Sequence, residues 1–168
     1  MALRSFEAEG LDVTMRPSPD PEKPLQQIGS GAADVSWGGP MRLLFAHDAD
    51  INSEAVAFCE VVGRDPFFLV GRVPNPGFTP RDLQGRRLGV VTEVPTPWMC
   101  LRHDLRLAGI DPATVMPMPP RTMAENVAAL RSGDLDVIQV FQPFPQALLD
   151  EGVGHIWYAA ATRGPTSY

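Results

Sequence analysis

The sequence predicts an α/β fold made of two similar lobes, and three observations support that prediction. Short apolar runs rich in β-branched residues alternate with helical patterns along the 168 residues, which is typical of α/β proteins with largely parallel sheets. One stretch, residues 82–109, indicates a strand, a turn and a helix in direct succession. A six-residue pattern also occurs once in each half of the chain.

The amino-acid composition limits the kinds of molecule that this protein can bind. Hydrophobic residues make up 44% of the chain, enough for a sizeable core, and the net charge is −6. Lys23 is the only lysine and the arginines are scattered, so we expect no nucleic-acid partner. No apolar run is long enough to cross a membrane. Acidic residues follow closely on Met1, so the start does not look like a secretion signal; we expect a cytoplasmic protein or a sequence without its leader.

The first half is predicted to contain short elements around proline-rich loops. We expect the end of a helix at 6–10, closed by Gly10, and a loop at 16–24. Helices are predicted at 25–28 and 40–47. Strands are predicted at four places: 11–15, 33–37, 54–62 and 67–70. Cys59 and Cys100 have no ligand-like spacing and lie in apolar surroundings, so we expect buried free thiols.

The second half follows a punctuated stretch at 72–80, which we expect to cross between lobes. One helical turn at 79–83 is predicted to be capped by Thr79. The strand 88–91 then leads into a helix with Thr96 at its N-cap, Pro97 at its first position and Gly109 at its end. The remaining predicted elements are strands at 114–118, 135–140 and 155–161 and helices at 121–131 and 143–150.

The repeated pattern is S-G-x-x-D-V, at 30–35 and again at 132–137. Each copy follows an apolar helix, and an aromatic residue and a helix-opening proline come after it. Chance similarity between α/β units is one explanation. The other is two similar lobes that face each other across a cleft, each presenting a loop with aromatic side chains. We expect Asp34 and Asp136 to play a structural role in the loop after Ser-Gly.

The helix that begins near Thr96 is the most informative element for function. A strand that leads into a helix N-terminus presents free backbone N–H groups and a positive dipole end to a small polar ligand. An ordinary strand–helix unit of a packed domain has the same pattern, so these residues alone leave both interpretations open.

The order of four segments resembles substrate-binding proteins of ABC importers, of the sulfonate, nitrate and thiamine-precursor type. The segments are EGLDV at 9–13, LQQIGSGAADVSWGGP at 25–40, FTPRDLQGRRLGV at 78–90 and LRSGDLDVIQVFQPF at 130–144. The resemblance covers nearly the whole chain. It implies a type II periplasmic-binding-protein-like fold, a two-lobe "Venus flytrap" with a ligand in the cleft between the lobes.

The resemblance also implies which residues face the ligand. The matched positions are Trp37, Gly38, Gly39 and Pro40 in the first lobe and Thr96, Pro97, Trp98, Phe141, Gln142, Pro143 and Phe144 in the second. Many members have an acid where this chain has Gln142, and the lost negative charge argues against a cationic ligand.

Family members are considerably longer than this chain. The matching divides it into a partial lobe 1 at 1–76, a complete lobe 2 at 77–162 and a hinge return at 163–168. The incomplete lobe 1 is predicted to expose apolar sheet surface. We therefore expect either a homodimer that covers this surface or a fragment of a longer product.

The function that follows is capture of a small, planar or anionic organic molecule for an ABC importer permease, in the periplasm by family resemblance. Trp37, Trp98, Phe141 and Phe144 are candidate stacking walls, although each is also a plausible core or surface residue. Thr96, Gln139 and Gln142 are candidate polar contacts, and Arg42 is either a surface charge or an anion partner. Closure about the crossovers at 73–78 and 161–165 is the expected mechanism.

Two other functional classes use the same fold. Thiamine-pyrimidine synthases share the fold, but they depend on a cysteine-rich motif and on histidines near the cleft, whereas this chain has two separated cysteines and only His47, His103 and His155. No catalytic triad, metal-ligand spacing or cofactor motif is evident, so we expect no enzyme, no metal and no cofactor. A ligand-sensing regulatory module is the third class, but nothing basic flanks the chain to suggest an attached DNA-binding domain.

Overall fold

The computed structural model describes residues 4–17, 23–115 and 117–166. The chain divides into two compact units, Met1–Ser36 and Trp37–Tyr168. In the first unit, helix α1 spans Ser5–Ala8 and helix α2 spans Lys23–Gly29, and neither contains a buried residue. Gly10 ends the α1 region with φ +75°, as the sequence predicted.

Three predicted strands are not formed. Residues 11–15, 33–37 and 54–62 have strand-like sequences but pair with no other segment in the described part of the chain. Their large apolar side chains are exposed, for example Met15 at 84% and Val56 at 77%. The physical reason is that a strand needs a partner for its backbone N–H and C=O groups, and alternating apolar residues alone do not supply one.

The second unit holds one four-stranded sheet. Its strands are β1 (Phe68–Gly71), β2 (Leu88–Gly89), β3 (Val137–Val140) and β4 (His155–Ala159), in the order β2-β3-β1-β4. The prediction of a largely parallel sheet was wrong. Only β2 and β3 form a parallel pair, because β1 inserts between β3 and β4 and runs antiparallel to both. Strands β2, β3 and β4, which helices connect, do run in one direction.

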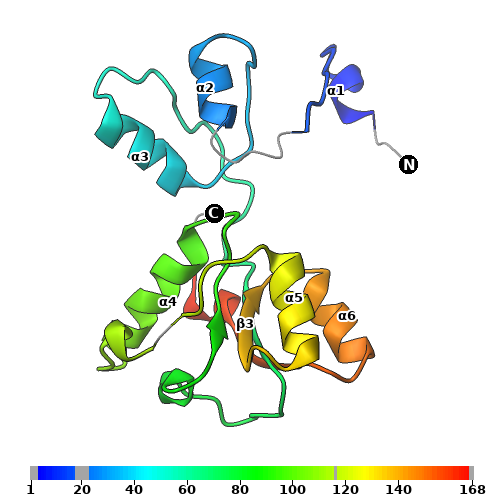
Figure 1. Cartoon of the computed structure of the whole chain (residues 1–168). Coiled ribbons are helices and arrows are strands. Elements are labelled where there is room, and N and C mark those ends of the chain that lie inside the picture. The colour runs from blue at the N-terminus through cyan, green and yellow to red at the C-terminus, as the bar shows by residue number, and fades with distance from the viewer. Residues whose placement is uncertain (1–3, 18–22, 116, 167–168) are drawn as a thin grey trace. The chain divides into compact units, whose positions relative to one another are not determined.

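Helices cover both faces of this sheet (Figure 1). Helix α4 (Thr96–Leu107) lies on one side, and helices α5 (Met123–Ser132) and α6 (Phe144–Asp150) lie on the other. Two apolar clusters follow this division. One contains Val127, Leu130 and Leu148 with β3 residue Ile138, and the other contains Leu101 and Leu105 with β3 residue Val137. Because side chains alternate along a strand, β3 contributes to both clusters.

Among the described residues, the remaining elements are one α-helix and three short 3₁₀ helices. Helix α3 (Pro40–Ala49) has no buried residue. The 3₁₀ helices are η1 (Pro80–Leu83), η2 (Pro112–Thr114) and η3 (Ala160–Arg163). Within the described residues, no helix is both long and apolar enough to cross a membrane.

Helix boundaries agree with several predicted caps and correct others. Thr79 caps η1 as predicted, in a capping box with Asp82. Helix α4 begins at Thr96, so Pro95 rather than Thr96 is the N-cap, and Gly109 follows the helix with φ +70°. Helix α5 starts at Met123 instead of residue 121, because the Thr122 side chain caps it.

The predicted strand at 114–118 is wrong for its described residues. They form the end of η2 and a single bridge between Pro117 and Leu88, and residue 116 lies outside the described part. A proline has no N–H to give to a ladder, and Pro119 and Pro120 follow directly, so a regular strand cannot form here.

The cysteine prediction needs one correction. Cys59 is an exposed free thiol, and Cys100 is only partly buried. Cys59 lies in the segment 54–62, which forms no strand, so no packed layer covers its thiol.

The segments that enter and leave the sheet run side by side. Phe67 accepts a hydrogen bond from the Ala160 N–H at 3.0 Å, and Gly63 accepts one from the Thr166 N–H at 3.0 Å. Arg163 joins this pair of segments to α4: its guanidinium binds Asp65 at 2.9 Å and Asp104 at 2.6 Å. The lobe boundaries at 76/77 and 162/163 stay a prediction, and residues 167 and 168 lie outside the described part.

Candidate functional site

The candidate site is one edge of the sheet in the second unit. Because β2 and β3 are parallel, their carboxyl ends meet at the same edge. The segments 90–97 and 141–144 leave the sheet there. Residues 121–123 join them, since the Thr92 N–H donates to the Arg121 carbonyl at 3.0 Å. Two of the predicted ligand-facing groups, 96–98 and 141–144, therefore lie at one edge.

The N-terminus of α4 has free hydrogen-bonding capacity. No side chain in the described part of the chain caps it, and its first turn has no acidic residue. Thr96 and Pro97 are both buried. By contrast, three side-chain oxygens accept hydrogen bonds from N–H groups at the start of α5. The Glu125 N–H donates to the Thr122 hydroxyl at 3.2 Å, and the Thr122 N–H donates to the Glu125 carboxylate at 2.8 Å. The Met123 N–H donates to the Glu93 carboxylate at 2.8 Å. Of these two helix starts, the positive end of α4 is therefore the one that a ligand can reach without displacing a capping oxygen.

Gln139 lies directly against this helix start. Its side chain is 4% exposed, and its Nε2 donates to the Pro97 carbonyl at 3.0 Å. Its Oε1 is buried and has no hydrogen-bond partner among the described residues. A buried amide oxygen without a donor is uncommon, which marks this position as one where a further polar group belongs.

Glu93 is a site residue that the sequence analysis missed. Its carboxylate accepts from the Met123 N–H, and its main-chain carbonyl accepts a hydrogen bond from the Arg42 guanidinium. The sequence did contain one feature that could have identified Glu93: it is an acidic residue between a buried strand and a helix start. The sequence leaves Arg42 as either a surface charge or an anion partner. In the structure it is partly buried, and its guanidinium donates a hydrogen bond to this carbonyl.

Two of the predicted aromatic walls pack into the core. Phe141 contacts Phe67 edge-to-face, with ring centroids 5.2 Å apart, and Phe144 is partly buried against the same cluster. Gln142 is exposed, and its Oε1 accepts from the Gln146 N–H at 3.3 Å, within the first turn of α6. The peptide bond between Gln142 and Pro143 is cis.

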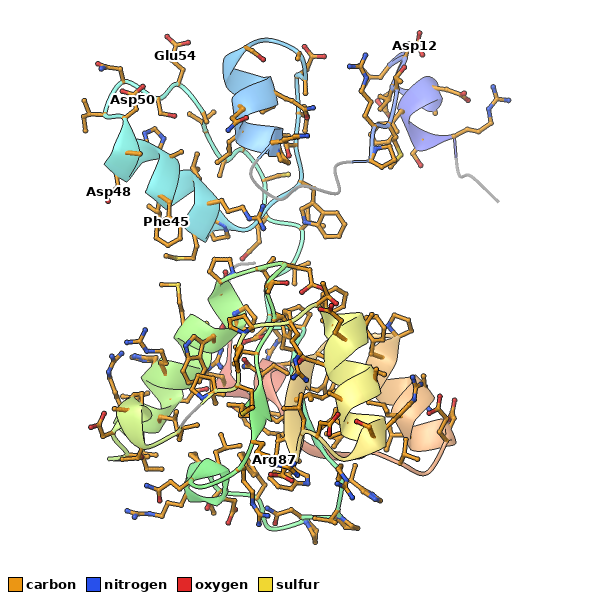
Figure 2. The ribbon with its side chains drawn as sticks, viewed as in Figure 1. Asp12, Phe45, Asp48, Asp50, Glu54 and Arg87 are labelled. Carbon is orange, nitrogen blue, oxygen red and sulfur yellow. The ribbon has the colours of Figure 1, made fainter. Side chains whose placement is uncertain are left out.

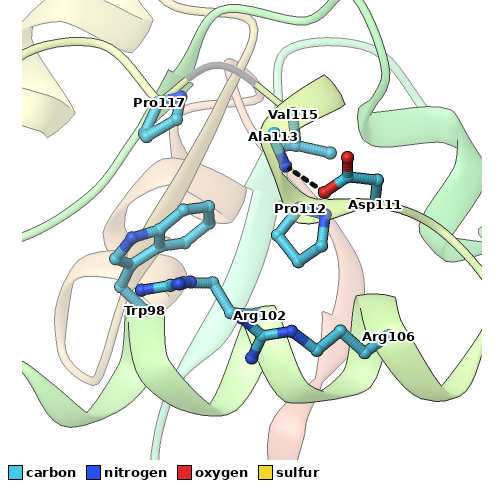
Figure 3. Close-up of a pocket in the computed structure, with 8 residues that line it drawn as sticks. All are labelled: Trp98, Arg102, Arg106, Asp111, Pro112, Ala113, Val115 and Pro117. Atoms are coloured by element: carbon cyan, nitrogen blue, oxygen red, sulfur yellow. Dashed lines mark hydrogen bonds between the residues drawn. The ribbon is translucent and has the colours of Figure 1, made fainter.

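Trp98 lines a different hollow, shown in Figure 3. This pocket of about 460 Å³ lies between α4 and the η2 region, with Arg102 and Arg106 on successive turns of α4. The Trp98 ring also packs partly against the core beneath α4. Trp98 therefore lies on the flank of α4 that carries the two arginines.

The predicted first-lobe loop surrounds the start of α3. Gly39 is the N-cap of that helix, Pro40 is its first residue, and Gly38 is exposed. The ring of Trp37 is 78% exposed, so little of the described chain covers it. Whether Trp37–Pro40 meet the α4 start around a ligand stays a prediction. Among the described residues, no three His, Cys, Asp or Glu side chains are grouped closely enough to hold a metal ion.

Comparison with known proteins identifies the family. The family model described as NMT1/THI5 like matches residues 5–153. The chain belongs to this NMT1/THI5-like family. It is also 24% identical over 152 residues to YtlA of Bacillus subtilis, described as a candidate binding protein. That match covers 90% of this chain and 46% of YtlA.

Solved structures of known binding proteins show the same fold. The periplasmic aliphatic sulphonate-binding protein SsuA from Escherichia coli matches with a TM-score of 0.75 at 19% identity, covering 96% of this chain and 54% of SsuA. SsuA from Xanthomonas axonopodis pv. citri, in a structure bound to MOPS, matches with a TM-score of 0.66 at 20% identity, over 96% of this chain and 55% of that one. The chain thus has the type II periplasmic-binding-protein-like fold and spans about half the length of these relatives.

Proposed function

We propose that this chain is part of a solute-binding protein of an ABC importer, and that it binds a small organic anion at the N-terminus of α4. The observation that carries the proposal is the uncapped start of α4. The buried Oε1 of Gln139 beside it has no partner among the described residues, and because it is an acceptor it suits a hydroxyl or amide donor of the same ligand and not the anionic end. Membership of the NMT1/THI5-like family and the SsuA-like fold support it.

The chemistry favours an anion over a cation. Helix α4 offers the N–H groups of Thr96 and Trp98 and the positive end of its dipole, while Pro97 has no N–H and the Met99 N–H donates to the Pro95 carbonyl at 3.2 Å. Glu93, the nearest acid along the chain, is already engaged with the Met123 N–H. A sulfonate, carboxylate or phosphate has the acceptor oxygens that such a helix start satisfies.

The family relationship supports three further parts of the proposal. We infer that a planar or apolar portion of the ligand stacks on an aromatic side chain, with exposed Trp37 as the first candidate. We infer an importer permease as the partner, and the periplasm as the location, because SsuA from Escherichia coli is described as periplasmic. The proposed activity is recognition without turnover, because the relatives compared are described as binding proteins. A homodimer stays a prediction that no observation supports.

Calorimetric titration with matched probes tests the proposal. Butanesulfonate and MOPS are the anionic probes, and butanol and butylammonium are the controls of similar size. We expect saturable heat with the two sulfonates only. Binding of butylammonium but not butanesulfonate contradicts an anion site.

Two threonine substitutions assign the site. Thr96→Asp puts a carboxylate at the start of α4, where it competes with a ligand anion, so sulfonate binding is expected to fall by at least about tenfold. The matched control is Thr122→Asp, at a helix start that Glu93 and Glu125 already serve, and it is expected to leave affinity within about twofold. Circular dichroism confirms that both variants are folded.

A further inference from the structure

We propose that the hollow between α4 and η2 is a docking surface for a short acidic segment of a partner protein, with one carboxylate on each of Arg102 and Arg106 and an aromatic ring against Trp98. We name this hollow the α4 groove. The proposal does not depend on the anion site at the start of α4, because that site uses backbone N–H groups and the α4 groove uses side chains.

The α4 groove is open on the surface of the second unit. Helix α4 contributes Trp98, Arg102 and Arg106 to one wall, and residues 111–113, 115 and 117 contribute the other. Five of the eight lining residues are exposed, and only Val115 is buried. A site for a free small molecule usually encloses most of its ligand. This groove covers one side of an occupant, which suits a segment whose other side faces its own protein.

The α4 side chains in this groove form a row along the helix. Trp98, Arg102 and Arg106 are four residues apart, so each lies about 6 Å from the next along the helix axis. Figure 3 shows both arginine side chains extending along α4 in the direction of Trp98. The row therefore presents one aromatic ring and two positive charges at regular spacing.

The two arginines are available to carboxylates. Among the residues that the structure describes, neither guanidinium has an ion-pair or hydrogen-bond partner. Other arginines of the same unit are paired: Arg87, labelled in Figure 2, binds Asp136 at 2.6 Å, and Arg131 binds Glu151 at 2.6 Å. Positive charges four residues apart repel each other on a helix, and bound carboxylates relieve that repulsion.

The one acid among the lining residues is engaged elsewhere. Asp111 is the N-cap of η2, and its Oδ1 accepts from the Ala113 N–H at 3.0 Å. The lining thus carries two positive charges and one negative charge, in a chain whose net charge is −6. This local excess of positive charge favours an acidic occupant over a basic one.

The spacing of the row defines the pattern of the occupant. In an extended segment, side chains two residues apart point to the same side and lie about 6.6 Å apart, close to the spacing of the row. The pattern aromatic-x-acid-x-acid therefore matches Trp98, Arg102 and Arg106 in turn. Pro112 and Pro117 supply apolar surface opposite the tryptophan for the aromatic ring. Tryptophan and arginine are also the residue types that most often dominate the binding energy of protein interfaces.

Peptide titration of the full chain at low salt tests this inference. The probe is Phe-Ser-Glu-Ser-Glu with blocked ends, and Glu-Ser-Glu-Ser-Phe covers the opposite chain direction. We expect one of them to give saturable shifts of the nuclear magnetic resonance signals of the Trp98 indole N–H and of the Arg102 and Arg106 Nε–H groups. Replacing both glutamates of that peptide by glutamine is expected to weaken binding at least about fivefold, and added salt is expected to weaken binding of the glutamate peptide.

A charge reversal supplies the specific readout. Arg102→Glu/Arg106→Glu is expected to lose the glutamate peptide and to bind the matching lysine peptide instead. Both positions are exposed, so this variant is expected to fold, which circular dichroism checks. The control Arg16→Glu/Arg81→Glu changes the net charge by the same amount at exposed positions outside the groove, and it is expected to keep the preference for glutamate.

Four results would overturn the inference. Absence of saturable shifts, or equal binding of the glutamate and glutamine peptides, would remove the acidic occupant. An equal loss of binding in the control variant would reduce the effect to net charge. Glutarate bound as tightly as the peptide would assign the groove to a small dianion. A dimer in sedimentation that Arg102→Glu/Arg106→Glu abolishes would assign it to a second copy. The butanesulfonate titration reports separately on the start of α4.

Discussion

The charge cluster around Arg163 yields the most detailed stability prediction. The guanidinium binds Asp104 through two nitrogens, at 2.6 to 3.0 Å, and Asp65 at 2.9 Å. Asp65 is 1% exposed. Replacement by methionine in Arg163→Met keeps most of the apolar stem and removes the charge, which leaves a buried carboxylate without its cation.

The expected loss is about 3 kcal/mol of unfolding free energy. Breaking a buried ion pair by removing one partner costs about 3–5 kcal/mol. The lower end applies for two reasons: Arg163 is itself 20% exposed, and Asp65 keeps the hydrogen bond from the Phe67 N–H at 2.9 Å. With a urea dependence of about 2 kcal/mol per molar, the midpoint falls by about 1.5 M.

Urea unfolding followed by tryptophan emission measures this loss. Trp157 is 8% exposed in β4 and its Nε1 donates to the Val73 carbonyl at 2.7 Å, so its emission reports on the folded sheet. The double variant Asp65→Asn/Arg163→Met is expected to recover about half of the loss, because the fully buried carboxylate is then neutral, while Asp104, whose side chain is 15% exposed, still lacks its cation. The control Arg102→Met, at an exposed position on α4, is expected to change stability by less than about 0.5 kcal/mol. A loss below about 1 kcal/mol in Arg163→Met, or no recovery in the double variant, refutes the reasoning.

Three further predictions concern single positions. The Arg87 guanidinium lowers the pKa of Asp136 to about 2 from its ordinary value of 3.8. This pair therefore stabilises the fold above about pH 4 and loses its contribution as the pH falls towards 2. Asp136→Asn should remove about 1–2 kcal/mol of unfolding free energy at pH 7 and flatten the pH dependence of urea unfolding between pH 4 and 2. A Cβ at Gly89 would lie 2.6 Å from the Leu135 side chain, so Gly89→Ala should lower stability by about 1–3 kcal/mol. Gly77→Ala, where a Cβ would meet no atom within 4 Å and φ is not positive, should cost less, and equal losses in thermal unfolding would contradict the packing. Thr122→Ala removes the α5 cap and should cost about 1 kcal/mol in urea unfolding, and an unchanged midpoint would show that Glu93 alone suffices.

Local chemistry was predictable where a few neighbouring residues decide the structure. The Thr-x-x-Asp pattern at Thr79 predicts a helix cap there, and Gly109 predicts the end of α4, since both features depend on contacts within a few residues. The positions of β1–β4 and of α4–α6 also followed from hydrophobic periodicity, which is a local property, whereas four other predicted strands did not form.

Longer-range features were not available from the same patterns. The antiparallel insertion of β1 between β3 and β4 depends on where the chain enters the sheet, which alternation does not encode. Arg163 and Asp65 are 98 residues apart, and neither belongs to a sequence motif that predicts their ion pair. In segments 11–15 and 33–36, the pattern of a strand was present, but a strand forms only when its partner supplies hydrogen bonds.

The candidate site was predicted in part for the same reason. The start of α4 followed from local sequence, and the structure leaves it uncapped. The aromatic rings of Phe141 and Phe144 are predicted from the sequence to face the ligand, but in the structure they pack in the core against residues distant in sequence, such as Phe67. The orientation of Gln139 towards Pro97 is likewise a tertiary contact.

The most direct test of the central claim is a ¹⁵N nuclear magnetic resonance titration of the chain with butanesulfonate. An anion held at the start of α4 is expected to shift the backbone N–H signals of Thr96 and Trp98 most strongly, with saturation. Largest shifts beside Arg102 and Arg106, or no saturable shift in the first turn of α4, would contradict an anion site at this helix start.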